Sequence, residues 1–391
     1  MKALRFASPL LAALALMSAH VQAADSIKVG VLTTLSGPAS APGIDQRDAI
    51  NLAMKLLGNK LGGLPAELIT VDDQFSPDAA KQAADRLLRR DKIDVLTGVI
   101  YSNVLLAVVP SAVANKTVVV SSNAGPAAIA GKECSPYFFS ASWQNDATHE
   151  AAGKYMTDKG YRRVALIAPN YPAGKDAAAG FKRFFKGELA SEMYPKLGQL
   201  DFAAEIAQIR STDVDAIYYF LPSGMGVNFT KQYAAAGMSS KIARVFQAYD
   251  ADQQMLTIGE LIEGVVNTGQ WSSDMDNEAN KRFVSEFTKA YGRVPSMYAS
   301  QAWDVVGLLD VAVRNVGGKI EDRDAFIAAI RAAKGFKSVR GDFRFGSNHF
   351  PIQSQYARVV TKGADGKYLN RMVGPVLKDH GDAYIGECAM K

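Results

Sequence analysis

The sequence predicts an α/β fold in which two similar units follow one another along the chain. Strand-like and helix-like segments alternate from residue 27 to residue 268. The strand-like segments are continuously apolar, as expected when helices cover both faces of a parallel sheet. The alternation restarts near residues 139–146, and a length of 391 residues also fits two domains.

The first unit is expected to contain three helices between apolar strands. The segment 78–90 follows Ser76-Pro77, a pair typical of a helix start, and apolar residues recur at helical spacing through 45–57. We predict strands at 27–32, 67–71, 94–99 and 117–120, and helices at 45–57, 78–90 and 104–114.

The second unit repeats this alternation, and the pattern changes after residue 268. We predict a helix at 147–159, a strand at 164–168 and a helix at 176–186, and the series continues through 201–209, 216–221, 226–236, 242–248 and 265–268. Helices at 278–291, 298–315 and 323–333 then precede strand-like segments at 338–345 and 355–361. Helices that would cover the first unit thus come after the second unit, which implies more than one crossing between the units.

Composition excludes several classes of protein. Hydrophobic residues make up 48% and charged residues 21%, which is ordinary for a folded chain and excludes intrinsic disorder. The net charge is 44 − 39 = +5, and the basic residues are scattered, so we expect no nucleic-acid partner. Two cysteines are too few for a disulfide-rich scaffold or a four-cysteine zinc site.

The first 23 residues have the pattern of a secretory leader. Lys2 and Arg5 precede the mostly apolar segment 6–17, and Val21-Gln22-Ala23 supplies small residues for cleavage after Ala23. The alternative is a buried N-terminal helix. No later apolar run reaches the roughly 20 residues that a membrane span needs. We therefore expect a periplasmic protein without stable membrane insertion.

Export decides how the two cysteines are interpreted. In an oxidising compartment, Cys134 and Cys388 are most simply one disulfide, which ties the C-terminus back to the first unit. The alternative is two unpaired buried thiols.

The motifs of common exported or nucleotide-using enzymes are missing. The sequence has no GxSxG, HExxH, GxGxxG or GxxxxGK[ST] motif, and Gly224-Met225-Gly226 is better interpreted as a helix start. His149, His349 and His380 are far apart and have no acid three or four residues downstream. Asp72-Asp73 follows a strand and is interpreted as a solvated strand end. We expect no catalytic residue, metal or cofactor.

Several segments carry a family resemblance through their order and spacing. They are 27–38, 71–73 with 78–84, Gly98 with Ser102, 120–124, 169–176, 218–220 and 263–265. Together they resemble the type I periplasmic solute-binding proteins of ABC importers, in the branched-chain amino acid (Leu/Ile/Val-binding) family. The segments 143–146 and 169–176 also resemble a branch of this family associated with aromatic carboxylates.

The resemblance implies two Rossmann-like lobes with parallel sheets joined by a three-strand hinge. After the signal peptide at 1–23, the N-terminal lobe would comprise 24–143 plus 269–354. The C-terminal lobe would comprise 144–268 plus 355–391. A small ligand would be held between the lobes.

Loops at the carboxyl ends of two strands are the candidate anion site, because such loops offer unpaired N–H groups and helix N-termini. By the resemblance they would hold a ligand carboxylate. An alternative for Ser102 and Asn103 is helix capping, which is compatible with binding. The candidate residues of these loops are Ser102, Asn103, Ser122, Asn123, Ala124 and Gly125.

Four aromatic residues are candidates for a wall over the ligand. Tyr171, Phe220 and Tyr249 lie at or just beyond the ends of strands in the second unit, and Tyr298 begins a helix. The alternative for each ring is ordinary core packing.

The ligand class follows from a departure from the family pattern. Gln144 and Tyr249 align with the two acids that hold a ligand ammonium, although Asp146 and Asp250 lie nearby. Burying an ammonium without a carboxylate is costly. We therefore expect an aromatic acid, with a hydrophobic amino acid as the close second.

The resemblance implies a monomeric substrate-binding component that delivers its ligand to a membrane permease and its ATPase. The alternatives are a periplasmic sensor subunit and an exported hydrolase.

Overall fold

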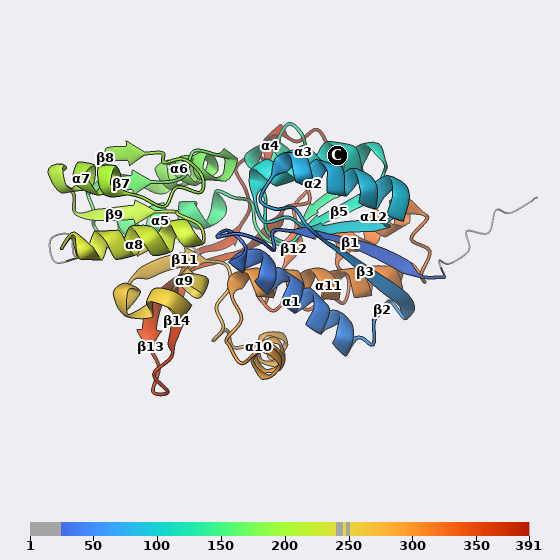
Figure 1. Cartoon of the computed structure of the whole chain (residues 1–391). Coiled ribbons are helices and arrows are strands. Elements are labelled where there is room, and N and C mark those ends of the chain that lie inside the picture. Colours follow the sequence, from blue (N-terminus) through green and yellow to red (C-terminus); the bar gives the residue numbers. More distant parts are fainter. Residues whose placement is uncertain (1–24, 240–244, 248–250, 391) are drawn as a thin grey trace, which may run out of the picture.

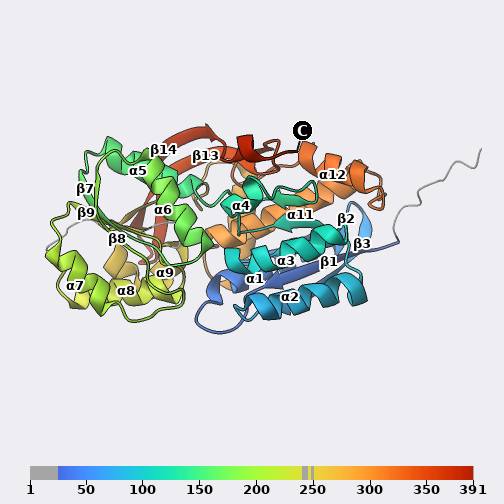
Figure 2. The same cartoon turned by 90° about the horizontal axis from the view of Figure 1, so that it is seen from above.

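The computed structural model describes residues 25–239, 245–247 and 251–390. Its elements form two layered units that lie side by side, each with a sheet between helices (Figure 1). Seen from above, the C-terminal strands run along one edge across both units (Figure 2). Among the described residues, no helix is long and apolar enough to cross a membrane.

The first unit is built on a six-stranded sheet of order β2-β3-β1-β4-β5-β6, in which only β2 is antiparallel to its neighbour. Every strand and helix predicted for this unit is present, with slightly different bounds. The strands are β1 (Ile27–Thr33), β2 (Lys60–Leu61), β3 (Leu64–Asp72), β4 (Val95–Gly98), β5 (Val118–Ser121) and β6 (Phe138–Ser140). The helices are α1 (Ala41–Leu56), α2 (Pro77–Arg86), its π-helical continuation Leu87–Asp91, α3 (Ser102–Ala114) and α4 (Ala127–Ala130).

The second unit has a parallel four-stranded sheet of order β10-β9-β7-β8. The predicted alternation is again present, and β8 is an addition that the sequence patterns did not indicate. The strands are β7 (Arg163–Ile167), β8 (Glu188–Met193), β9 (Ala216–Tyr219) and β10 (Val245–Gln247). The helices are α5 (Ala147–Asp158), α6 (Pro172–Phe184), α7 (Ala203–Ser211) and α8 (Gly224–Ala235).

The last part of the chain returns to the first unit and also builds a third, antiparallel sheet. α11 packs along α1, as the sequence pattern predicted. The strands of this sheet are β11 (Val266–Gly269), β12 (Arg344–Phe345), β13 (Pro351–Lys362) and β14 (Tyr368–His380). The helices are α9 (Ala251–Ile258), the 3₁₀ turn Gly259–Ile262, α10 (Glu278–Tyr291), α11 (Met297–Asn315), α12 (Arg323–Ala332) and the 3₁₀ turn Ile385–Glu387.

The prediction of a strand over 338–345 is largely wrong. Only Arg344–Phe345 forms a strand, because the preceding residues fold around the buried carboxylate of Asp304. Ser338 Oγ and the Val339 N–H donate to this carboxylate at 2.5 and 3.0 Å, and the Arg340 guanidinium donates to it at 3.0 Å.

The C-terminal segment is fastened to the first unit. Cys134 and Cys388 form a disulfide, which confirms the predicted pairing. Asn348 Nδ2 donates to the Ala130 carbonyl at 2.8 Å and to Asp382 Oδ2 at 2.9 Å, close to the same point. The segment therefore bridges from β14 to the loop that precedes β6.

Candidate functional site

The carboxyl ends of three neighbouring strands meet at one edge of the first sheet. Gly98 at the end of β4 pairs with Ser121 at the end of β5, and Ser121 pairs with Ser140 at the end of β6. The three following loops lead into α3, α4 and α5. Parallel α/β sheets place ligands beyond this edge.

The loop after β4 begins with a strained turn. Gly98 has a φ of +99°, and a Cβ there would lie 2.3 Å from the Leu32 carbonyl oxygen. Val99 follows with a φ of 59°, which is an outlier for a β-branched residue. Its N–H donates to Leu32 O at 2.6 Å and its carbonyl accepts from Ala124 N at 3.2 Å. The turn therefore fixes where α3 begins relative to the next loop.

Ser102, the first residue of α3, is held by a side chain from the third loop. Asn145 Nδ2 donates to Ser102 Oγ at 3.0 Å, and Asn145 Oδ1 accepts from the Gly125 N–H at 3.1 Å. The Ser102 hydroxyl hydrogen has no acceptor among the described residues. Neither Ser102 nor Asn103 caps α3, since its N-cap residue is Tyr101 and no side chain makes a capping bond. The first-turn amides of α3 thus lie beside a hydroxyl that can donate.

The second loop is already well bonded internally. Ala124 N donates to Val99 O, and the Ser122 hydroxyl donates to Gly98 O at 3.3 Å. Asn123 Nδ2 donates to Ile100 O at 2.7 Å, while its Oδ1 and that of Asn103 are buried without a partner among the described residues. The loop is therefore rigid, and its amides shape the site around Ser102.

The aromatic candidates lie in two groups. Tyr171 precedes α6, and its ring centre lies 6.4 Å from that of Phe220, which packs 5.1 Å from His149. Tyr298 lies in the first turn of α11, with its ring centre 6.4 Å from that of Trp143. The Trp143 carbonyl oxygen lies 2.2 Å from where a Cβ on Gly125 would stand, so this pair adjoins the second loop. Tyr249, the fourth candidate, lies outside the described residues.

The acids near these loops are engaged within the protein. Gln144 Nε2 donates to Asp146 Oδ1 at 2.8 Å, and Asp146 Oδ2 receives Arg183 at 3.0 Å and Tyr384 at 2.9 Å. Burial, followed by the charge of Asp176, raises the pKa of Asp146 to about 7. Asp176 Oδ2 accepts from Ala127 N and Asn145 Nδ2, and burial raises its pKa. Asp250 lies outside the described residues.

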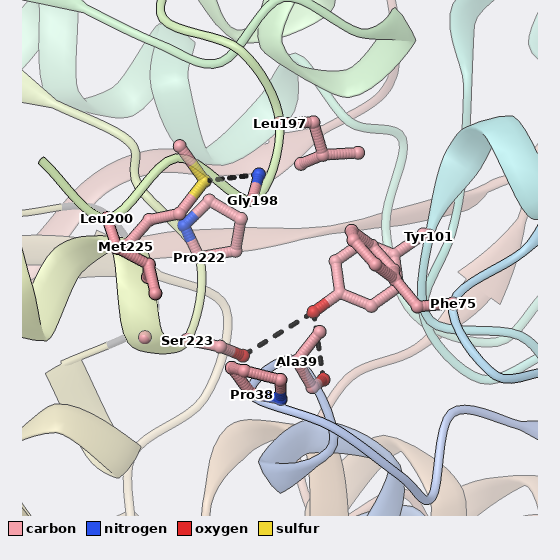
Figure 3. A pocket seen from close by; sticks show the side chains of 11 residues that line it. Pro38, Ala39, Phe75, Tyr101, Leu197, Gly198, Leu200, Pro222, Ser223 and Met225 are labelled. Atoms are coloured by element: carbon pink, nitrogen blue, oxygen red, sulfur yellow. Dashed lines mark hydrogen bonds between the residues drawn. The ribbon is translucent and has the colours of Figure 1, made fainter.

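An apolar cavity of about 180 Å³ lies between the units, next to Tyr101 (Figure 3). Tyr101 Oη donates to the Ala39 carbonyl at 3.0 Å and lies 3.5 Å from Ser223 Oγ of the second unit. The lining residues are Pro38, Ala39, Phe75 and Tyr101 from the first unit and Leu197, Gly198, Leu200, Pro222, Ser223, Gly224 and Met225 from the second. Within the described ranges, no three His, Cys, Asp or Glu residues are grouped as metal ligands.

Two long-range hydrogen bonds were not predicted from the sequence. Asn145 stands 43 positions from Ser102, and Arg340 reaches Ala141 O across 199 positions at 2.6 Å. Only the resemblance of the segment around Asn145 to family members gave a signal, and no local pattern marked Arg340.

Comparison with known proteins agrees with this architecture. The profile of a family described as periplasmic binding protein matches residues 26–367. Leu/Ile/Val-binding protein homolog 6 of Brucella melitensis is 30% identical over 378 residues, which cover 93% of this chain and 95% of the relative.

Solved structures of binding proteins superpose closely. An ABC-transporter solute-binding protein from R. palustris in complex with benzoate is 31% identical with a TM-score of 0.87, covering 93% of this chain and 99% of that chain. A second R. palustris solute-binding protein, in complex with 4-hydroxybenzoate, is 27% identical with a TM-score of 0.84, covering 91% and 98%.

The fold defines a type I periplasmic binding protein. The chain belongs to the periplasmic binding protein family, as an ABC-type solute-binding protein of the Leu/Ile/Val-binding group. Its relatives are binding proteins and not enzymes, so the hydrolase alternative is set aside.

Proposed function

We propose that this protein binds a small aromatic carboxylate between its two lobes and delivers it to the permease and ATPase of an uptake system. The observation that carries the proposal is the state of the acids near Ser102. Asp146 is bonded to Gln144 and paired with Arg183, and Asp176 accepts from Ala127 N and Asn145 Nδ2 through one oxygen, so both acids are already engaged within the protein. A carboxylate without an ammonium fits such a site. The benzoate and 4-hydroxybenzoate complexes of the similar R. palustris proteins support the same ligand class.

The ligand carboxylate would be bound at the N-terminus of α3. The Ser102 hydroxyl donates a hydrogen bond, and the first-turn amides of α3 favour negative charge. Asn145 orients Ser102, and the loop residues Asn103, Ser122, Asn123, Ala124 and Gly125 build the wall around the anion. Tyr171, Phe220 and Tyr298 contribute aromatic surface for the ring of the ligand.

The cavity in Figure 3 supports an aryl ligand by its size and lining. An apolar cavity of about 150 Å³ accommodates benzene in another protein, and this one measures about 180 Å³. It opens beside Tyr101, the neighbour of Ser102. An apolar part of the ligand that extends past Tyr101 would enter it.

No covalent chemistry is required. Tyr101 lies near Ser223 across the cleft, and Gln253 Nε2 of α9 donates to Asp45 Oδ2 of α1 at 3.1 Å. A ligand that touches both lobes would stabilise a closed arrangement with such contacts by its differential affinity for it. The permease would recognise the closed form.

We propose lobes of 24–143 plus 269–354 and of 144–268 plus 355–391, with export directed by residues 1–23. The packing of α11 along α1 supports the assignment of 269–354 to the first lobe. The protein would act as a monomer in the periplasm after cleavage behind Ala23.

Titration calorimetry of the protein lacking residues 1–23 tests the ligand class. Benzoate and 4-hydroxybenzoate are expected to give saturable heat, and leucine none. Heat with leucine alone would make the hydrophobic amino acid the ligand and overturn the proposal.

A further inference from the structure

Three glutamine side chains are buried with no hydrogen-bond partner among the described residues. One directly follows β11, one lies in α11 and one lies in β13. Gln270, Gln301 and Gln355 are 1%, 0% and 0% exposed, and neither the nitrogen nor the oxygen of each amide is bonded. Burial of an amide without a partner is unfavourable. Something polar is therefore expected to bind there.

Two of these amides share one face of the third sheet. β11 ends at Gly269, which stands opposite Tyr356 of β13. Continuing this alternation by one residue sets Gln270 opposite Gln355, on the same face. On that face, Gln353 Nε2 donates to Ser142 O at 2.7 Å and Thr268 Oγ1 donates to Thr148 O at 2.6 Å. This face therefore lies against the segment 142–148.

Gln301 approaches the same segment from α11. Tyr298, three residues before it on the helix, packs on Trp143. Asp304, three residues after it, binds Arg340, which donates to Ser142 O at 2.8 Å. Residues three apart share a helix face, so Gln301 lies between two side chains that reach residues 142 and 143. The neighbours of the three glutamines thus contact the segment 142–148, which also carries Asn145.

We propose that Gln270, Gln301 and Gln355 bind a polar substituent on the ligand ring, remote from its carboxylate. The ligand class is then a hydroxylated aromatic acid and not an unsubstituted one. A phenolic hydroxyl both donates and accepts, and so does a glutamine amide. A site built to hydrogen-bond a hydroxyl discriminates against an analogue without it, because the buried amides are left unpaired. This inference rests on the proposed function, since it concerns the same ligand.

Calorimetric titration with benzoate and 4-hydroxybenzoate tests the inference. The wild type is expected to bind 4-hydroxybenzoate at least about tenfold more tightly, or about 1.4 kcal/mol. Gln301→Leu and Gln355→Leu, which keep the side-chain size, should each lose most of this preference and retain benzoate. Gln82→Leu, on the exposed face of α2, should behave as wild type.

The outcomes separate the two proposals. If the wild type binds benzoate as tightly as 4-hydroxybenzoate, or if the folded variants keep the wild-type ratio, the amides bind only water and the inference is wrong. The wild-type ratio decides even where a variant fails to fold. If neither acid binds to the wild type, the proposed function itself fails, and this inference fails with it.

Discussion

The side-chain nitrogen of Asn145 donates a hydrogen bond to the hydroxyl oxygen of Ser102 at 3.0 Å. This bond joins the loop between β6 and α5 to the first turn of α3. It leaves the hydroxyl hydrogen of Ser102 free to reach a ligand. Asn145 also receives the Gly125 N–H and donates to Asp176 Oδ2 at 2.8 Å. The Asn145 side chain therefore forms hydrogen bonds with three segments around the candidate anion site.

Ser102→Ala should weaken the binding of an aromatic acid strongly. A hydrogen bond to a charged group contributes about 1.5–3 kcal/mol, which corresponds to a loss of about 10- to 150-fold in affinity. Asn145→Ala should give a smaller loss, because Ser102 keeps its hydroxyl but loses its orientation. Calorimetric dissociation constants measure both. Asn115→Ala is the matched control, because this exposed side-chain amide at the C-terminal end of α3 donates to Ser111 O at 2.7 Å. Wild-type affinity in Ser102→Ala would remove Ser102 from the site.

Arg340→Met should destabilise the fold by about 3–5 kcal/mol, the usual result of removing one partner of a buried ion pair. Arg340 and Asp304 are each 1% exposed, and Arg340 also binds the Ala141 and Ser142 carbonyls and Gln353 Oε1. Urea unfolding provides the measurement. Arg344→Met, which removes an exposed pair with Asp379, should change stability by less than about 1 kcal/mol. Equal losses of unfolding free energy from the two substitutions would show that the buried Arg340–Asp304 pair stabilises the fold no more than the exposed Arg344–Asp379 pair does.

Loss of the disulfide should lower the free energy of unfolding. The bond closes a loop of 254 positions, and the chain-entropy model gives roughly 5 kcal/mol as the upper figure. The double variant Cys134→Ser, Cys388→Ser should therefore melt at a lower temperature than the oxidised wild type. A reductant should lower the melting temperature of the wild type and leave the variant unchanged. A wild type insensitive to reductant under unfolding conditions would contradict this account.

Acid should destabilise the protein through His149. Burial lowers the pKa of His149 to about 3 from 6.5, so between these values only the unfolded chain binds the proton. The contribution of neutral His149 is then complete above pH 6.5 and falls as the pH drops, by at most about 1.4 kcal/mol per pH unit. Asp146, whose pKa is raised to about 7, contributes with the opposite sign in the same range, so the difference between variant and wild type is the quantity that reports His149. His149→Gln should show a shallower fall between pH 6.5 and 4.5 in urea unfolding. His349, whose pKa burial lowers to about 4, keeps part of the slope in the variant. Identical slopes would exclude His149 as the cause.

The elements that bury a regular apolar face were predictable from the sequence. The strands β4 and β5 are buried along their whole length, and α10 has the bounds that its helical spacing predicts. The strands β8 and β14 were missed because many of their residues are exposed and polar. An edge strand of this kind lacks the apolar run that marks the central strands.

The anion-site loops were predictable because they follow apolar strands, which place them at one edge. Their internal bonding was not, because it depends on side chains from distant segments. Asn145 and Asp176 stand 31 positions apart and Arg340 and Ser142 stand 198 apart, and no local pattern encodes such contacts.

Small-angle scattering combined with calorimetry on the protein lacking residues 1–23 tests whether the two lobes close around an aromatic acid. We predict that 4-hydroxybenzoate binds saturably and reduces the radius of gyration as the lobes close over it, while leucine does neither. An unchanged scattering profile, with no heat from any small aromatic acid, would contradict it.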